Sequence, residues 1–420
     1  MRNKKKFNEF MNKTIDELKD EKRYGTAHIY QSTLNAFSEF CGCEVIYFHQ
    51  LNRANLKEFE TYLRDKQLSW NTVSTYMRTL RATYNKAVDK KIITENSRLF
   101  HHVYTGVKND IKRALEVAAS GGHNLIMIGS PGSGKSMMAK CMPSILPPLS
   151  LGESLETTKI HSIAGKLGKD SSLIAIRPFR SPHHTISQVA MVGGGTNPQP
   201  GEISLAHNGL LFLDELPEFN RSVLEVLRQP LEDRYISISR AKYSLDYPAS
   251  FMLVASMNPC PCGYYNHPTR ACVCNPGQVQ RYLNRISGPL LDRIDIQIEI
   301  VPVPFEKMAE QHHAESSASI RKRVIKARKI QAQRFANHPG IYCNAQMEAG
   351  LLHLYAQPNE AGLKLLQTAM TRLNLSARAY GRILKVARTI ADLDNSEHIT
   401  SIHLAEAISY RNLDREDWAG

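Results

Sequence analysis

The most constraining feature of the sequence is the octapeptide GSPGSGKS at residues 129–136. It fits the pattern G-x-x-x-x-G-K-[ST], in which glycines let the loop turn tightly so that backbone N–H groups face phosphate oxygens. The apolar run NLIMI precedes it as a predicted strand, and MMAKCM follows it as a predicted helix. This order of strand, loop and helix predicts an α/β domain that binds a nucleoside triphosphate at a helix N-terminus.

Two motifs carry the predicted ATP chemistry. The residues predicted to bind ATP are Gly129, Ser130, Pro131, Gly132, Ser133, Gly134, Lys135 and Ser136. Lys135 is expected to reach the β- and γ-phosphates, and Ser136 to offer its hydroxyl to Mg²⁺. The apolar run LLFLDE ends in Asp214, expected to hold Mg²⁺ through water, and Glu215, expected to orient the attacking water. Lys135 and Glu215 are therefore predicted to be catalytic, which argues against a fold that binds ATP without hydrolysing it.

Three stretches of different pattern divide the chain. Residues 1–105 carry apolar residues at helical spacing. Their clearest stripe comprises Val73, Tyr76, Met77, Leu80, Tyr84 and Val88. Between 106 and 305, short continuous apolar runs alternate with helical segments, as in buried parallel sheets. Residues 306–420 return to helical patterns, strongest in SARAYGRILKVARTIADL. The sequence thus predicts a helical domain, an α/β core and a helical lid.

Charge favours a polyanionic partner. Lys and Arg number 53 against 40 Asp and Glu, which gives +13 and a pI near 9.3. Residues 1–105 hold 18 Lys and Arg against 12 Asp and Glu, so they account for +6 of it. Such an excess suggests nucleic acid, although a merely basic soluble protein has the same property. No apolar run is long enough to span a bilayer and the N-terminus lacks a signal-peptide core, so no membrane contact and a cytoplasmic location are expected.

The N-terminal stretch resembles a known family. RYGTAHIYQSTLNAF, LSWNTVSTYMRTLRATYNKAV and VYTGV are similar to the SAM-like core-binding domain of tyrosine recombinases of the phage-integrase type. In that family the bundle clamps duplex DNA, so the resemblance implies DNA binding, with Arg78 and Arg81 off the buried stripe as candidate contacts. No recombinase Arg/His/Arg constellation follows, so recombination is not expected. A bundle retained without DNA contact is the alternative.

Residues 112–420 resemble a second family. ASGGHN, GSPGSGKS, IHSIAG, RPFRSPHHTIS, VGGGTNPQPGEISLAHNGLLFLDELPEF, LRQPLED, NPCPCGYY and SGPLLDRID are similar to the magnesium-chelatase-like AAA+ proteins of the ComM/YifB group. That family implies a homo-hexameric motor using ATP and Mg²⁺, and its competence members drive branch migration of DNA. Members of that family normally carry a Lon-protease-like domain at the place where this chain carries the recombinase-like bundle. A functional gene fusion and a rearranged gene would both produce the domain order of this chain.

The two resemblances give a multidomain fold class. An all-α SAM-like helical bundle is expected over residues 1–105, an α/β P-loop AAA+ core with inserted hairpins over 106–305, and an all-α lid of the magnesium-chelatase C-terminal type over 306–420. The AAA+ resemblance also implies three further catalytic residues. Asn258 at the end of FMLVASMNP matches sensor 1, Arg293 in SGPLLDRIDI matches the arginine that enters a neighbour's ATP site, and Arg378 in LSARAYGRI matches sensor 2. Taken singly, an arginine in the context of Arg293 is more often part of a helix-end salt bridge, and the alternative for Arg378 is a partner for a nearby carboxylate.

Two insertions are predicted to form hairpins. One lies between residues 183 and 208, around the VGGG and NPQPG turns, and the other is YISISRAKYSLDYPASF at 235–251. In related ring motors such hairpins grip the phosphate backbone, so Arg240 and Lys242 at the second tip are predicted to contact duplex or branched DNA. A lysine at a turn is otherwise simply solvated. The adjacent residues His183 and His184 belong to the family signature but receive no predicted role.

Four of the eight cysteines cluster as CPC and CVC. They are Cys260, Cys262, Cys272 and Cys274. Four thiolates suit a tetrahedral zinc site, and in a cytoplasmic chain this clustering suggests metal before disulfides. The CxC spacing is tighter than the CxxC that is usual for zinc, so four reduced buried cysteines in a structured loop are the alternative.

The leading interpretation is an ATP-hydrolysing AAA+ ring motor acting on DNA, a branch-migration helicase or translocase in recombination or transformation. Two alternatives stay open. One is a chelatase-type motor for metal insertion, which shares the core fold. The other is a DNA-binding integrase remnant without motor activity. ATP hydrolysis and its stimulation by DNA separate the three.

Overall fold

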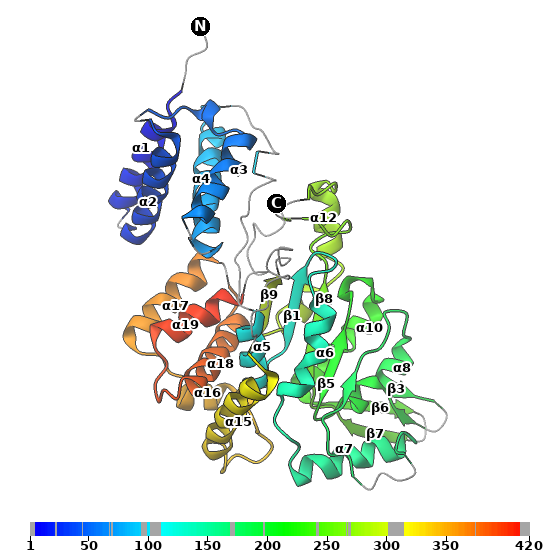
Figure 1. Ribbon diagram of the computed structural model, residues 1–420. Coiled ribbons are helices and arrows are strands. Elements are labelled where there is room, and N and C mark those ends of the chain that lie inside the picture. Colours follow the sequence, from blue (N-terminus) through cyan, green and yellow to red (C-terminus); the bar gives the residue numbers. More distant parts are fainter. Residues whose placement is uncertain are drawn as a thin grey trace. The chain divides into compact units, whose positions relative to one another are not determined.

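The computed structural model (Figure 1) describes the chain except for residues 1–4, 22, 44, 67, 69, 94–98, 101–110, 169–172, 196–197, 241–242, 266, 268–269, 301–314, 374 and 412–420. Two compact units make up the chain, one of residues 1–108 with 262–273 and the other of 109–261 with 274–420. Among the described helices, none is both long and apolar enough to cross a membrane.

The N-terminal unit is a helical bundle. Its elements are α1 (Phe7–Asp20), α2 (Tyr24–Cys41), η1 (Phe48–Gln50), α3 (Arg53–Asp65) and α4 (Trp70–Asp89). Phe7 packs edge-to-face on Phe37 and Phe48, with ring centroids 6.1 and 5.4 Å apart. Val73 and Met77 of the predicted stripe are fully buried on α4. The aromatic and aliphatic stripes of these helices therefore form one shared core.

The second unit is built on a five-stranded parallel sheet in the order β2-β5-β8-β1-β9. The strands are β1 (Leu125–Gly129), β2 (Phe179–Arg180), β5 (Leu210–Leu213), β8 (Met252–Met257) and β9 (Ile296–Ile300). The apolar runs before the P-loop, before Asp214 and before Asn258 are thus β1, β5 and β8. Because every pairing is parallel, the carboxyl ends of these strands meet at one edge, where α/β sheets bind ligands.

Alternation along the strands sends side chains into two cores. Leu125 and Met127 join an apolar cluster with α5 (Ile111–Gly121), α6 (Lys135–Ile145) and the lid. Ile126 and Ile128 join a second cluster on the opposite face. That face is covered by α10 (Arg221–Glu225), α11 (Arg228–Asp233) and α13 (Gly288–Leu291). Burial on both faces explains why the strands are continuously apolar.

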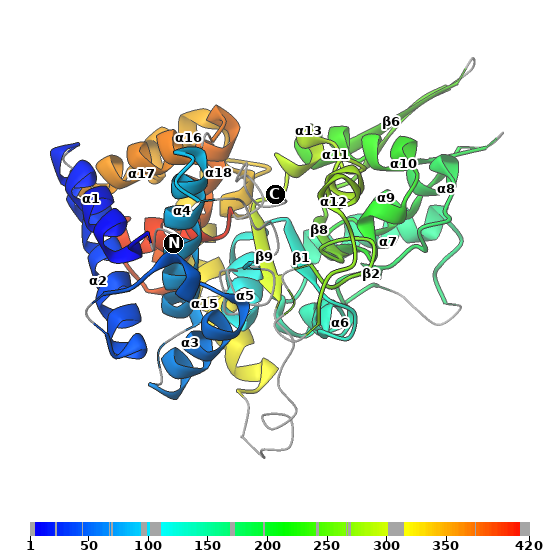
Figure 2. The ribbon, with the colours of Figure 1, turned by 90° about the horizontal axis from the view of Figure 1, so that it is seen from above.

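Both predicted hairpins are present. β3 (Gly193–Gly194) pairs with β4 (Gln199–Pro200), and β6 (Tyr235–Arg240) pairs with β7 (Tyr243–Pro248), both antiparallel. The hydroxyl of Tyr247 donates to the carbonyl of Pro198, 2.9 Å away, and so links the two. Figure 2 shows the β6–β7 hairpin extending away from the sheet. The remaining core elements are α7 (Leu151–Ile163), α8 (Gln188–Val192), α9 (Glu202–Leu205), η2 (Leu216–Glu218) and α12 (Pro276–Leu283).

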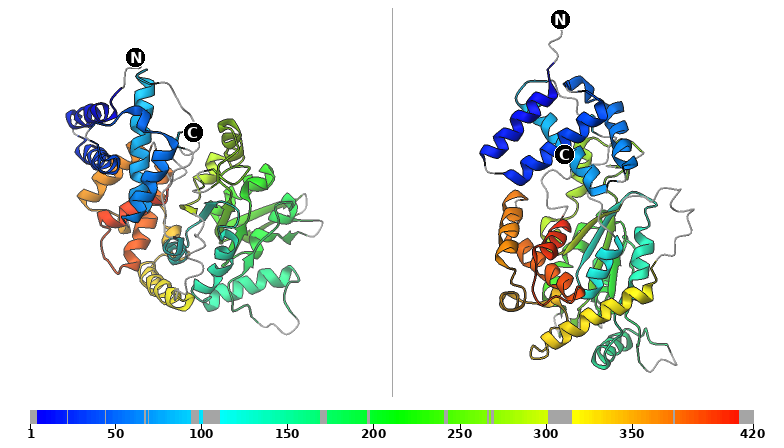
Figure 3. Two further views of the ribbon diagram at one scale, coloured as in Figure 1. Left: turned by 45° about the horizontal axis from the view of Figure 1, so that its top comes forward. Right: turned by 60° about the vertical axis from the view of Figure 1, so that its left-hand side comes forward.

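The lid is entirely helical in its described part. It comprises α15 (Ser317–Arg334), η3 (Asn344–Gln346), α16 (Ala349–Tyr355), α17 (Glu360–Arg372), α18 (Ala377–Leu393) and α19 (Ser401–Ser409). Figure 3 shows these helices, coloured from yellow to red, gathered on one side of the sheet. Their apolar faces extend the cluster around Leu125. The predicted order of helical bundle, α/β core and helical lid is confirmed.

Candidate ATP site and flanking elements

The P-loop links the end of β1 to the start of α6. Gly132 and Gly134 have φ values of 77° and 88°, a left-handed region that L side chains rarely adopt. Gly129 needs to be glycine for space, since an added Cβ would lie 2.8 Å from the carbonyl oxygen of Ile300. The loop therefore turns sharply and delivers the first N–H groups of α6, whose positive dipole end suits a phosphate.

Lys135, the first residue of α6, connects the P-loop with the end of β8. Its side chain is buried, and its ammonium donates to the carbonyl oxygens of Gly129 at 2.6 Å and Ser130 at 3.0 Å. It also donates to Oδ1 of Asn258 at 3.1 Å. Burial lowers the pKa of Lys135, while the charge of Asp214 opposes that shift. Two predicted catalytic residues, Lys135 and Asn258, are thus in direct contact.

Ser136 and Asp214 form the second contact of the site. The Ser136 hydroxyl donates to Oδ2 of Asp214 at 2.7 Å. The other carboxylate oxygen accepts from the Ser256 hydroxyl and, at 3.1 Å, from the backbone N–H of Glu215. A hydroxyl and a carboxylate side by side fit the oxygen ligands that Mg²⁺ prefers. Ser256 was missed from the sequence, although it lies two residues before Asn258 and so faces the same side of β8.

Glu215 adopts an unusual backbone conformation beside this pair. Its φ is 53°, which is uncommon for a residue other than glycine and points to a local constraint. Its side chain is more than half exposed, with a carboxylate oxygen 3.6 Å from Nδ1 of His184. The rings of His183 and His184 lie 4.1 Å apart between centroids. The histidine pair, which had no predicted role, therefore flanks the predicted catalytic glutamate.

Arg293 is buried away from the P-loop. One guanidinium nitrogen lies 2.6 Å from a carboxylate oxygen of Glu232, and another donates to the carbonyl of Pro289 at 2.6 Å. Arg293 also lines a cavity of about 650 Å³ that includes Glu225 and Arg228. Among the described residues, no contact joins Arg293 to the P-loop. The salt bridge that the sequence analysis gave as the alternative role of Arg293 is thus present in this chain.

Two arginines of α18 have different surroundings. Arg378 is exposed in the first turn, and no described contact connects it with the P-loop. Arg382 instead forms an ion pair with the buried Asp295 at 2.5 Å. The backbone N–H of Asn124, just before β1, donates to the same carboxylate at 2.9 Å. Arg382, which sequence reasoning did not single out, therefore anchors the lid to the start of the P-loop strand.

Comparison with protein families identifies both parts of the chain. Residues 104–308 match the family model described as magnesium chelatase, subunit ChlI, and residues 314–411 match the model of its C-terminal region. The chain belongs to the ChlI-like AAA+ family. Residues 6–103 match the phage integrase SAM-like domain, so the resemblance at the N-terminus is also confirmed.

Individual relatives agree with this assignment. The protein YifB of Salmonella typhimurium is 48% identical over 308 residues, 72% of this chain and 59% of that protein. The competence protein ComM of Haemophilus influenzae is 46% identical over 305 residues, 72% of this chain and 58% of that protein. The DNA replication licensing factor Mcm2 of Drosophila melanogaster is 23% identical over 245 residues, 54% of this chain and 23% of that protein. The chain thus spans less than two thirds of the length of each of these relatives. The ChlI-like family itself implies binding of ATP and Mg²⁺ and hydrolysis of ATP.

The residues predicted to contact DNA lie on elements outside the ATP site of this ChlI-like core. Arg240 ends β6 in register with Tyr243, while Lys242 lies outside the described residues. In the N-terminal unit, Arg78 and Arg81 are half-buried on α4. Nε of Arg78 lies 3.4 Å from a backbone carbonyl one turn earlier. Their contact with DNA stays a prediction.

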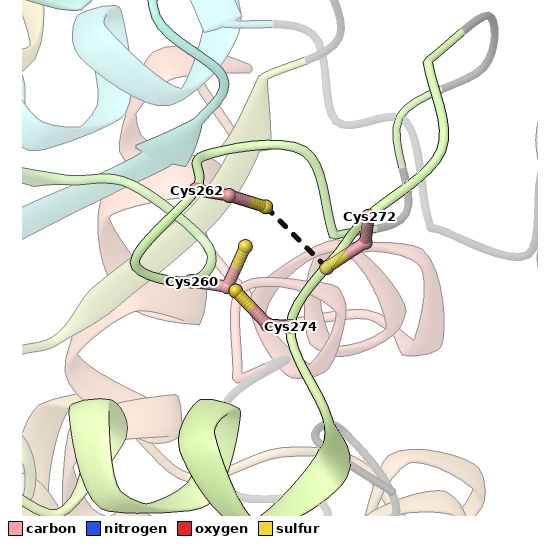
Figure 4. A group of neighbouring side chains, drawn as sticks. All are labelled: Cys260, Cys262, Cys272 and Cys274. Atoms are coloured by element: carbon pink, nitrogen blue, oxygen red, sulfur yellow. Dashed lines mark hydrogen bonds between the residues drawn. The ribbon is translucent and has the colours of Figure 1, made fainter.

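The four clustered cysteines form a group within one continuous segment of the ChlI-like chain, residues 260–274. The sulfur atoms of Cys260, Cys262, Cys272 and Cys274 all lie within 4.8 Å of one another, and Figure 4 shows the side chains converging. Cys260 is buried and the other three are half-buried. The arrangement is suitable for a metal ion.

Proposed function

We propose that this chain is an ATP-hydrolysing motor that acts on DNA as a branch-migration helicase or translocase and assembles as a homo-hexamer. One observation carries the ATPase part: Lys135, Ser136 and Asp214 converge at the N-terminus of α6. Membership in the ChlI-like family implies hydrolysis of ATP. Action on DNA and ring assembly go beyond that family assignment.

Binding of ATP uses groups already in place. The N–H groups of the P-loop receive the phosphates, and Lys135 exchanges carbonyl oxygens for β- and γ-phosphate oxygens. Ser136 and Asp214 would hold Mg²⁺, which neutralises charge on the phosphates. Because Asp214 accepts three hydrogen bonds, its two oxygens are held in a fixed orientation before nucleotide binds.

Hydrolysis requires a positioned water molecule. Glu215 orients and activates this water, and the amide of Asn258 holds it near the γ-phosphate. For that step the Glu215 carboxylate leaves the neighbourhood of His184, 3.6 Å away. Its left-handed backbone supports the interpretation that the glutamate is constrained before nucleotide binds.

The positive groups that stabilise the transition state come from outside the P-loop. Arg293 of one subunit enters the ATP site of its neighbour, and Arg378 approaches from the lid. Arginines placed in this way stabilise charge that develops on the transferred phosphoryl group. Glu232 is then the resting partner of Arg293. On ring assembly Arg293 leaves Glu232 for the phosphates in the neighbour's ATP site.

Four observations support DNA as the partner. The N-terminal unit matches a phage integrase SAM-like domain, and the whole chain carries a formal charge of +13. The β6–β7 hairpin extends from the core. One relative is named a DNA replication licensing factor, Mcm2, and another is named a competence protein, ComM. A basic hairpin and a basic bundle suit phosphate contacts that are independent of sequence.

An ATPase assay of the full chain tests the proposal, with no DNA, linear duplex and branched DNA in parallel. We expect the chain to hydrolyse ATP and DNA to stimulate this hydrolysis several-fold, with branched DNA giving the strongest effect. The Lys135→Ala substitution should abolish hydrolysis. Hydrolysis without any response to DNA would favour a chelatase-type motor, and absence of hydrolysis would favour an integrase remnant.

A further inference from the structure

The loop between β8 and α12 carries the strongest feature that ATP chemistry leaves unused. Four cysteine sulfur atoms lie within 4.8 Å of one another, and those of Cys262 and Cys272 are 3.5 Å apart. Two come from CPC at one end of the loop and two from CVC at the other. Gly263, with φ of 81°, provides the turn directly after the first pair.

These distances match one particular metal geometry. Zinc binds thiolates at about 2.3 Å in a tetrahedron, whose corners are then about 3.8 Å apart. The 3.5 Å between the sulfur atoms of Cys262 and Cys272 lies just below this value, and no pair of the four is more than 4.8 Å apart. A disulfide requires sulfur atoms about 2.05 Å apart, well below the 3.5 Å between Cys262 and Cys272.

We propose that Cys260, Cys262, Cys272 and Cys274 bind one structural zinc ion as four thiolates. Each thiol releases its proton to solvent as its sulfur–zinc bond forms, and no electron is transferred. A set of four protein ligands closes the coordination sphere, so the ion has a structural role without an open position for catalysis.

The only histidine between the two cysteine pairs is engaged elsewhere. Nδ1 of His267 accepts a hydrogen bond of 3.0 Å from the backbone N–H of Arg270. The Arg270 guanidinium in turn donates to the hydroxyl of Tyr264 at 2.7 Å. These contacts hold Tyr264, His267 and Arg270 together and leave the four sulfur atoms as the ligand set.

The zinc site lies between two elements that hold the sensor amide. Cys260 comes two residues after Asn258, which accepts a hydrogen bond from Lys135. Asn275 directly follows Cys274 and caps α12 by accepting from the N–H of Gln278 at 2.9 Å. Burial raises the pKa of the Tyr282 hydroxyl on α12 and the backbone of Asn258 opposes that shift, so the two groups are neighbours. Zinc therefore ties the sensor strand to α12, and its removal is expected to slow hydrolysis more than it weakens ATP binding.

Metal analysis of the full chain tests the site directly. Protein purified under reducing conditions without chelator is expected to contain about one zinc per chain. Cys274→Ser is expected to lose most of it, Cys274→His to retain it because imidazole also binds zinc, and the exposed Cys141→Ser to behave like the wild type. Replacement by Co²⁺ should give the visible absorption of tetrahedral thiolate coordination.

A variant that misfolds does not obscure the result, because chelation, cobalt uptake and thiol labelling all use the wild-type chain. Zinc-dependent protection of four thiols from alkylation supports the site. Wild-type protein that neither contains zinc nor takes up zinc or cobalt overturns it, as does zinc content unchanged in a Cys260→Ser/Cys274→Ser variant. None of these measurements of zinc content, cobalt uptake or thiol labelling depends on the proposed action on DNA.

Discussion

The phosphate-binding groups and the arginines proposed to complete the site differ in how the chain holds them. Lys135, Ser136 and the groups they contact lie within 2.6 to 3.1 Å of their partners inside one core. Arg293 is instead bound to Glu232, and Arg378 is exposed. The groups proposed to bind ATP are therefore preassembled, whereas the groups proposed to accelerate hydrolysis must be supplied by a neighbouring subunit or by movement of the lid. Binding and turnover should accordingly be separable by mutation.

The largest separation is expected at Arg293. Arg293→Ala should reduce turnover by about 10³-fold, the lower end of the effect of an arginine finger, and leave ATP affinity nearly unchanged. Steady-state hydrolysis and binding of a fluorescent nucleotide measure the two quantities. Glu232→Gln is the matched control, since it removes the resting partner but keeps the arginine. An equal loss of affinity in Arg293→Ala would show that this arginine only supports the fold.

Glu215 should give the next largest effect. Glu215→Gln should slow hydrolysis by about 10² to 10⁴-fold, the usual contribution of a general base, while nucleotide still binds. Glu218→Gln removes a nearby carboxylate that pairs with Arg285, 2.9 Å away, and serves as the control. Hydrolysis at the wild-type rate in Glu215→Gln refutes the assignment.

The two arginines of α18 should separate catalysis from stability. Arg378→Ala should lower turnover by about tenfold, or about 1.4 kcal/mol of barrier, at unchanged thermal stability. Arg382→Ala should destabilise the fold by about 3 kcal/mol, because it leaves the buried Asp295 without its ion-pair partner. Thermal unfolding and steady-state kinetics of both variants measure the contrast. If Arg378→Ala is fully active and Arg382→Ala is stable but inactive, the sensor role belongs to Arg382.

The smallest expected effect concerns the N-terminal bundle as a DNA tether. Arg78→Ala/Arg81→Ala should leave basal hydrolysis unchanged and weaken binding to unrelated DNA sequences, with the salt slope reduced by about 2. Lys90→Ala is the control, since its ammonium already pairs with Glu17 at 3.1 Å. Salt titrations of DNA binding compare the variants. Deletion of residues 1–105 extends the test, and an unchanged affinity and slope would rule out a tether.

The centre of the ATP site was predictable because its motifs are local. Lys135, Asp214 and Asn258 each follow a recognisable apolar strand, and parallel strands bring their carboxyl ends together. The hydrogen bonds from Lys135 to Asn258 and from Ser136 to Asp214 agree with that grouping, and the catalytic roles of these residues stay predictions. Ser256 could have been added from the alternation of β8, which gives it the same side as Asn258.

The outer parts of the site were less predictable because they depend on contacts between distant segments. Arg378 and Arg382 are four residues apart and share a helix face, so periodicity alone cannot decide which one meets Asp295. The partner of Arg293 lies on α11, far earlier in the chain, and no local pattern names it. His184 meets Glu215 through a similar long-range contact.

The most direct test of the central claim mixes two inactive proteins. Lys135→Ala lacks the lysine proposed to bind phosphate, and Arg293→Ala lacks the arginine proposed to act on a neighbour. If the site spans two subunits, some interfaces in mixed rings combine an intact P-loop with an intact arginine, so hydrolysis should return in proportion to co-assembly. Co-assembled rings of the two variants that remain inactive at every mixing ratio would contradict the account.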